Sequence, residues 1–256
     1  MARVHYERRG SGPLLLLLHG IGSNSRSFRY QLAELSDSWT VVAWDAPGYG
    51  RSDDPLQPFS LEDLADRAVS LLDELEVDRA HVLGVSMGGV IAQLVYHRQP
   101  MRVRSLILAD TNPGGGGLPE PERSARVQGR LEALARWGPR GMAEARAPVL
   151  LRPDAPPELV AEVTEIMAEV RPAGYCAAAI ALGATDLTAL LGAIAVPTLV
   201  IHGAQDRVVP PETGRMLADS VPGAHYVLIP DAGHVSNQEQ PAAFNAAVRR
   251  FLLDSN

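Results

Sequence analysis

The stretch 82–91 reads Val-Leu-Gly-Val-Ser-Met-Gly-Gly-Val-Ile and fits the pattern G-x-S-x-G. In this pattern a strand turns sharply into a helix and leaves the serine, here Ser86, at the apex with its hydroxyl exposed. Glycine is needed two residues before and after the serine because a Cβ there would collide with the neighbouring strand or helix. Apolar residues at 80–83 precede the motif, and apolar residues with helical spacing follow it. The segment therefore predicts a strand, a tight turn that carries a candidate nucleophile, and a helix.

A serine nucleophile needs a base, and the base needs a residue that orients it. Asp206 follows the apolar strand pattern at 196–202, and His234 follows a second strand pattern at 226–229. The chain order is nucleophile, acid and histidine, which differs from the orders of chymotrypsin-like and subtilisin-like proteases. Asp110, at the end of an earlier predicted strand, is the alternative acid. We predict Ser86, Asp206 and His234 as a catalytic triad.

A serine that attacks a carbonyl also needs hydrogen-bond donors for the oxyanion that forms. Met87 begins the helix after the serine, so its backbone N–H lies at the positive helix end. The second donor is expected in the glycine-containing loop 19–22, which follows an apolar strand pattern at 14–18. We assign it to the N–H of Ile21, which follows the His-Gly pair in that loop.

These motifs make the chain resemble the α/β-hydrolase superfamily over nearly its whole length. The segment 45–52, Asp-Ala-Pro-Gly-Tyr-Gly-Arg-Ser, is similar to the D-x-x-G-x-G-x-S turn of that superfamily. The tail 233–241 and the stretch 176–180 resemble the 3-oxoadipate enol-lactonase branch of small lactonases and esterases. The resemblance implies an α/β fold with a mostly parallel central sheet, flanking helices and a helical cap inserted after strand 6.

The sequence pattern divides the chain into a core and a cap. Residues 1–112 alternate strand and helix signals, as a parallel sheet with crossover helices requires. A glycine-rich hinge at 112–117 leads into helical sequence that is rich in Arg and Ala. We predict a helical cap at 113–191, between the sixth and seventh core strands, and a second part of the core at 192–256.

Composition excludes several other classes of function. The chain has 256 residues, 46% hydrophobic, with a net charge of −7 and no dense basic patch, so nucleic acid is not an expected partner. Its apolar stretches are too short to span a bilayer, and we expect a cytoplasmic protein. All 23 basic residues are arginine, which excludes Schiff-base chemistry through lysine. The histidines lack metal-ligand spacing, so no metal or other cofactor is expected, and the oligomeric state stays open.

The cap is expected to set the choice of substrate because it closes over the serine. Arg126 and Arg130 share a helix face at i and i+4, so either side chain is a candidate for binding a substrate carboxylate. The alternative is a solvated face paired with nearby Glu residues. Trp137 and His19 are further candidates for substrate contact, with cap packing and loop shaping as their respective alternatives.

The residues and the resemblance together predict a serine hydrolase that acts on a small ester or lactone through an acyl-enzyme. The resemblance to enol-lactonases implies a cyclic substrate that carries a carboxylate. The same triad is also compatible with hydrolysis of a C–C bond or with cofactor-free perhydrolysis. A third alternative is a small-ligand receptor with a hydrolase fold, since a fold does not by itself specify a function.

Overall fold

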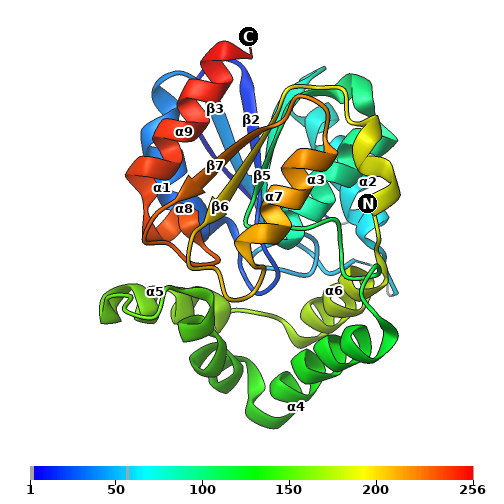
Figure 1. The fold of residues 1–256 in the computed structure, drawn as a ribbon, viewed down its shortest axis with the longest axis vertical. Helices are drawn as coiled ribbons and strands as arrows, with labels where there is room; N and C mark the ends of the chain where they lie inside the picture. Colours follow the sequence, from blue (N-terminus) through cyan, green and yellow to red (C-terminus); the bar gives the residue numbers. More distant parts are fainter. Residues whose placement is uncertain (1–2, 56–57, 256) are drawn as a thin grey trace.

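The computed structural model of the chain describes residues 3–55 and 58–255. Seven strands form one sheet in the order β1-β3-β2-β4-β5-β6-β7 (Figure 1). β1 runs antiparallel to β3, and every other neighbouring pair is parallel. The strands are β1 (Tyr6–Arg9), β2 (Leu14–Leu18), β3 (Thr40–Trp44), β4 (Ala80–Val85), β5 (Val103–Ala109), β6 (Thr198–Gly203) and β7 (His225–Ile229). The mostly parallel sheet predicted from the sequence is confirmed.

The central strands are continuous apolar runs because helices cover both faces of the sheet. All five residues of β2 are buried, and their side chains alternate between two hydrophobic clusters. Leu16 packs on the side of α2, α3 and α7, whereas Leu17 packs on the side of α1 and α9 (Figure 1). These helices are α1 (Arg29–Glu34), α2 (Leu61–Glu74), α3 (Met87–Arg98), α7 (Pro211–Ser220) and α9 (Pro241–Asp254).

Three further helices form a separate layer at one end of the sheet, which we call the cap (Figure 1). They are α4 (Glu120–Leu150), α5 (Pro157–Met167) and α6 (Pro172–Ala184). The cap lies inside the predicted range 113–191 but follows β5, so five described strands precede it and not the six that we predicted. The count differs because the chain before Leu14 contributes a single described strand. None of the helices in the described residues is long and apolar enough to span a membrane.

The turn between β4 and α3 depends on close contact between backbones. A Cβ on Gly84 would lie 2.1 Å from the carbonyl oxygen of Gly88. A Cβ on Gly88 would lie 2.0 Å from the carbonyl oxygen of Leu18, at the end of β2. Backbone atoms cannot rotate away as a side chain can, so these two positions exclude every residue larger than glycine.

We expect Gly88→Ala to lower the free energy of unfolding by about 3 kcal/mol or more, since α3 must move away from β2 to make room. Gly129 is the matched control, because it lies within α4 and a Cβ there meets no atom within 4 Å. Gly129→Ala should raise the free energy of unfolding by about 0.5–1 kcal/mol. Urea denaturation measures both changes, and equal effects of the two substitutions would contradict the steric account.

Candidate active site

Ser86 stands at the apex of the turn between β4 and α3. Its backbone has φ 55° and ψ −119°, a strained conformation for a residue with a Cβ. The N–H of Ser86 donates to the carbonyl oxygen of Ala109 at 2.9 Å, and its own carbonyl accepts from the Thr111 hydroxyl at 2.6 Å. Ala109 is the last residue of the neighbouring strand β5, and Thr111 lies two residues further along the chain. The strained conformation is thus fixed by hydrogen bonds on both sides of the residue.

His234 links the serine to a carboxylate. Its Nε2 lies 2.9 Å from the Ser86 hydroxyl oxygen, and its Nδ1 lies 2.8 Å from Oδ2 of Asp206. Asp206 follows β6 and His234 follows β7, so both turns meet Ser86 at the same end of the sheet. With the proton on Nδ1 donated to Asp206, Nε2 is free to accept the hydroxyl proton of the serine. The structure therefore brings together the three residues that the sequence predicted.

The Asp206 carboxylate is well suited to hold an imidazolium. Burial opposes its ionisation, but the charge on His234 and hydrogen bonds from His202 and His234 outweigh burial and keep the pKa of Asp206 well below its ordinary value. Its Oδ1 also accepts from the N–H groups of Val208 and Val209 at 2.8 and 3.0 Å. Asp206 consequently stays ionised at neutral pH although it is only 5% exposed.

Asp110, the alternative acid, is fully buried but forms different contacts. Its Oδ1 accepts from the Gly203 N–H at 2.8 Å, and its Oδ2 accepts from the N–H and hydroxyl of Ser236 at 3.0 and 2.7 Å. Burial raises the pKa of Asp110 to about 6. These bonds join β5 to β6 and to α8 (Ser236–Glu239), which directly follows the His234 turn. Asp110 thus holds the framework of the site and does not contact His234 through a hydrogen bond.

His202 completes a buried cluster with the two carboxylates. Ligand atoms of Asp110, His202 and Asp206 lie within 4.8 Å of one another, which is close enough for a metal ion. The Nε2–H of His202, however, donates to the Val209 carbonyl at 2.8 Å and lies 3.3 Å from Oδ2 of Asp206. Since Asp206 also binds His234, each of the three side chains already has a hydrogen-bond partner within the protein.

The loop after β2 lies directly over the serine. A Cβ on Gly20 would lie 3.2 Å from the Cβ of Ser86 and 3.7 Å from its hydroxyl oxygen. Ile21, the next residue, lines the cavity above Ser86. Met87 is the first residue of α3, so its N–H has no acceptor within the helix. The predicted oxyanion donors therefore come from two backbone segments next to Ser86.

His19 shapes this loop and does not line the cavity. Its Nε2 accepts from the Ala46 N–H at 3.0 Å, so its Nδ1 donates to the Gly20 carbonyl at 2.8 Å. Burial lowers the pKa of His19, which keeps the ring neutral as this pair of bonds requires. The suggested contact of His19 with substrate is therefore not supported, whereas loop shaping is.

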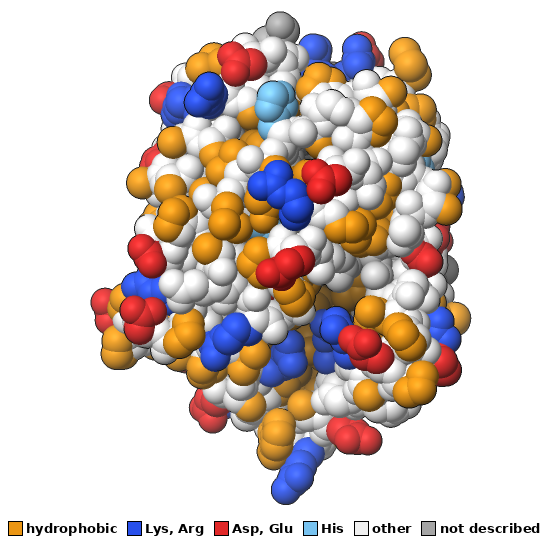
Figure 2. Space-filling model, in the orientation of Figure 1, with side chains coloured by type: hydrophobic (Ala, Val, Ile, Leu, Met, Phe, Trp, Pro, Cys, Tyr) orange, Lys and Arg blue, Asp and Glu red, His pale blue; other side chains and the backbone are white. Residues whose placement is uncertain are grey.

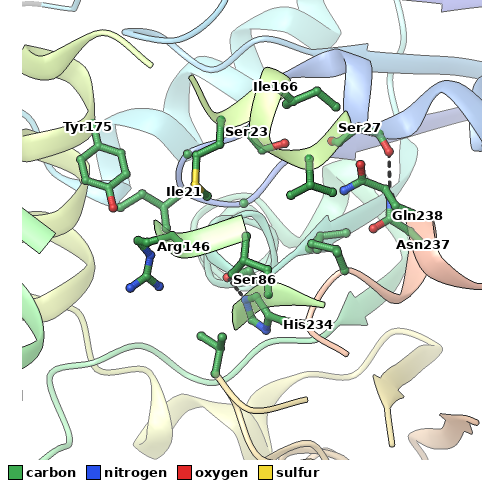
Figure 3. A pocket seen from close by; sticks show the side chains of 18 of the residues that line it. Ile21, Ser23, Ser27, Ser86, Arg146, Ile166, Tyr175, His234, Asn237 and Gln238 are labelled. Atoms are coloured by element: carbon green, nitrogen blue, oxygen red, sulfur yellow. Dashed lines mark hydrogen bonds between the residues drawn. The ribbon is translucent and has the colours of Figure 1, made fainter. Parts of the chain in front are cut away.

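A cavity of about 50 Å³ lies between the core and the cap, above Ser86 (Figure 3). Its walls are largely apolar, with polar side chains at opposite sides of the serine. Figure 3 shows Arg146 and Tyr175 of the cap on one side of Ser86 and Gln238 of the core on the other. The apolar side chains that line it are Ile21, Val85, Leu150, Val163, Ile166, Met167, Val208 and Val235.

Of the three cap residues predicted to contact substrate, the structure places one at the cavity and two outside it. Arg130 lines the cavity, but Arg126 lies on the exposed face of α4 and pairs with Glu122 at 2.8 Å. Trp137 is 49% exposed and lies outside the cavity. Arg130 thus fits the expectation that one of the two arginines faces the substrate, whereas the suggested contact of Trp137 with substrate is not supported. Trp137 directly precedes Gly138, where α4 turns sharply with φ 64°.

The second arginine of the cavity, Arg146, was not predicted. It lies beyond the break in α4, where the periodicity of the first half of the helix no longer applies. Tyr175 and Gln238 also line the cavity and were not predicted. Helical periodicity counted separately for the residues after Gly138 could have identified Arg146 as a residue that faces the cavity.

Comparisons with known proteins agree on one family. A family model described as alpha/beta hydrolase fold matches residues 13–241. The 3-oxoadipate enol-lactonase 2 of Acinetobacter baylyi is 31% identical over 248 residues, which cover 95% of this chain and 90% of that protein. A thermophilic esterase from Thermogutta terrifontis has a similar structure, with a TM-score of 0.92, 30% identity and coverage of 99% and 94% of the two chains. An enol-lactonase from Burkholderia xenovorans has a TM-score of 0.87, 30% identity and coverage of 98% and 97%.

Because Asp206 and Asp110 form different hydrogen bonds, replacing each of them with asparagine should have a different effect. Asp206→Asn should lower kcat for p-nitrophenyl acetate by about 10⁴-fold, because it favours the wrong tautomer of His234. Asp110→Asn should lower kcat much less but should lower the free energy of unfolding by about 1–3 kcal/mol, since one buried N–H loses its acceptor. Steady-state kinetics and urea denaturation of both variants provide the test. The reverse ranking of the kcat values would assign the acid to Asp110.

Proposed function

Because the chain belongs to the α/β-hydrolase fold family, we propose that it is a serine hydrolase that cleaves a small ester or lactone. The observation that carries the proposal is the continuous chain of hydrogen bonds from the Ser86 hydroxyl through His234 to Asp206, at the floor of a largely apolar cavity. This arrangement supplies a nucleophile, a base of suitable tautomer and an orienting carboxylate. The similarity to enol-lactonases and an esterase supports the same bond type.

In the proposed reaction the Ser86 oxygen attacks the substrate carbonyl while its proton moves to Nε2 of His234. The carbonyl oxygen takes up the negative charge, and the N–H groups of Ile21 and Met87 stabilise it. As the tetrahedral intermediate collapses, His234 gives its proton to the departing alcohol oxygen, and an ester of Ser86 remains. A water molecule then gives a proton to His234 and attacks this ester. As the second tetrahedral intermediate collapses, His234 returns that proton to the Ser86 oxygen, the acid is released and the enzyme is restored.

The position of Ser86 at the start of α3 contributes to this chemistry. The N-terminal end of α3 carries a partial positive charge, and its free N–H groups face the site where the oxyanion forms. In a cavity that excludes most water, such fixed dipoles stabilise the developing charge more strongly than solvent does. The apolar walls of the cavity therefore support catalysis as well as substrate binding.

We further propose that the substrate carries a carboxylate. Arg130 and Arg146 line the cavity, and neither forms a hydrogen bond or ion pair with an acidic residue in the described parts of the chain. Burial lowers the pKa of Arg130, and the neighbouring charge of Arg146 acts in the same direction. Two close, partly buried cations without a counter-ion favour an anionic ligand.

The surface outside the cavity supports the same conclusion. Figure 2 shows basic side chains gathered around a hollow where the cap meets the core. Arg130 and Arg146 also line an outer groove, together with Arg126 and Arg207. Positive charge thus extends from the outside to the cavity, which attracts an anion along the way to Ser86.

A panel of substrates tests the proposed bond type. We expect wild-type protein to hydrolyse short p-nitrophenyl esters and five- or six-membered lactones, and Ser86→Ala to lower kcat by at least about 10⁴-fold while the fold is retained. Circular dichroism of the variant is the control for folding. Cleavage of a diketone alone, or transfer of the acyl group to peroxide alone, would contradict ester hydrolysis and indicate one of these other reactions. A single slow turnover per molecule would indicate a receptor instead.

Matched arginine variants test the anionic substrate. Arg130→Gln and Arg146→Gln should each raise KM for a carboxylate-bearing lactone by about 10- to 200-fold, the equivalent of roughly 1.5–3 kcal/mol for a charged hydrogen bond. The uncharged methyl ester of the same compound should be nearly unaffected. Arg140→Gln is the control, because Arg140 is exposed, pairs with Glu165 at 2.6 Å and lines neither the cavity nor the outer groove. Equal losses on the charged and uncharged substrates would show that the arginines only hold the cap together.

A further inference from the structure

Gln238 lies at the cavity wall, and its side-chain amide oxygen is buried without a hydrogen bond. The residue is 6% exposed and belongs to α8, the short helix after the His234 turn. Its Oε1 is buried and has no hydrogen-bond partner within residues 3–55 and 58–255. Gln238 lines the cavity on the side of Ser86 away from Arg146 (Figure 3).

The neighbouring buried amides behave differently. Asn237 donates to the Ser27 carbonyl at 2.9 Å and to the Gln31 side chain at 3.3 Å. Gln31 in turn donates to the Asn237 carbonyl at 3.1 Å and to the Asn245 side chain at 2.8 Å. These three amides form a connected network, and Asn237 also lines the cavity. Gln238 is next to this network in the sequence but takes no part in it, so the need for structural hydrogen bonds does not explain a glutamine at this position.

A buried amide oxygen without a partner is unfavourable, because it is shielded from water and accepts no hydrogen bond from the protein. An apolar side chain of the same shape would remove this cost. The amide becomes favourable only when a ligand supplies a donor and an acceptor. Because Gln238 lies at the cavity wall, a bound substrate is the group that can supply these missing partners.

We propose that Gln238 determines specificity by binding an amide group in the acyl part of the substrate. This inference rests on the proposed ester hydrolysis at Ser86 and adds a second polar subsite to it. A primary amide presents one acceptor and one donor side by side, and a substrate amide offers the complementary pair. A carboxylate lacks the donor that Oε1 requires, and Arg146, which attracts a carboxylate, lies on the other side of Ser86.

Two esters of nearly equal shape test the subsite. p-Nitrophenyl N-acetylglycinate carries an amide in its acyl chain, and p-nitrophenyl 4-methylpentanoate replaces that amide with hydrocarbon. The measured quantity is the ratio of their kcat/KM values, compared between proteins so that the intrinsic reactivities of the esters cancel. Gln238→Met keeps the shape and removes the amide. We expect it to lower the ratio by about 10- to 100-fold relative to wild type.

Gln240→Met is the matched control. Gln240 is two residues further along the chain, lies outside the cavity and donates to the Asp231 carbonyl at 3.1 Å. Its replacement should leave the ratio unchanged. The melting temperature of Gln238→Met should not fall below that of wild type, because no structural hydrogen bond is lost. An unchanged ratio in Gln238→Met, or an equal loss on both esters, would overturn the proposal.

Binding measurements separate this inference from the proposed reaction. In the Ser86→Ala background, calorimetry gives dissociation constants for both esters without turnover. The ratio of these constants should change by about 10- to 100-fold when Gln238→Met is added. If wild-type protein hydrolyses neither ester, the proposed reaction fails, and this binding ratio still decides the role of Gln238. A binding ratio that does not change would overturn that role.

Discussion

The contact between the backbone of α3 and the end of β2 is the constraint on which the site depends. Gly88 brings the two so close that a Cβ would lie 2.0 Å from the Leu18 carbonyl oxygen. This packing forces the chain at Ser86 into a conformation that costs on the order of 1–3 kcal/mol, and burial of the surrounding sheet offsets that cost. The same contact places the serine hydroxyl against His234 and places the loop with Ile21 over it. A rigid turn thus positions the nucleophile and both expected oxyanion donors at once.

The cap and the catalytic histidine share a hydrogen-bonded junction. The His234 N–H donates to the carbonyl of Leu150, the last residue of α4, at 2.7 Å. The Glu239 carboxylate accepts from the N–H groups of Gly233 and Arg152 at 2.6 and 2.9 Å. The end of α4 that follows Arg146 is therefore fixed to the turn that carries the base. This junction fixes one side of the cavity relative to the triad, because hydrogen bonds join the helix that carries the arginines to the turn that carries His234.

The sequence was sufficient for features that depend on strand ends and glycines. Ser86, Asp206 and His234 each follow an apolar strand pattern, and parallel strands end at the same edge of the sheet, so their convergence could be predicted. The cap was less predictable because its inner face depends on the break at Gly138, which moves Trp137 outward and Arg146 inward. The role proposed for Gln238 depends on hydrogen bonds that are missing, and sequence patterns do not show missing partners.

From the proposed reaction we expect Ser86 to form a covalent acyl intermediate with an ester. This expectation is tested most directly by rapid acid quench of the protein with p-nitrophenyl acetate, followed by mass spectrometry of the intact chain and of its peptides. We expect one acetyl group per chain, located on Ser86, and no acetyl group when His234 is replaced by glutamine. A label on Cys176 or on another residue, or rapid hydrolysis without any covalent species on Ser86, would contradict it.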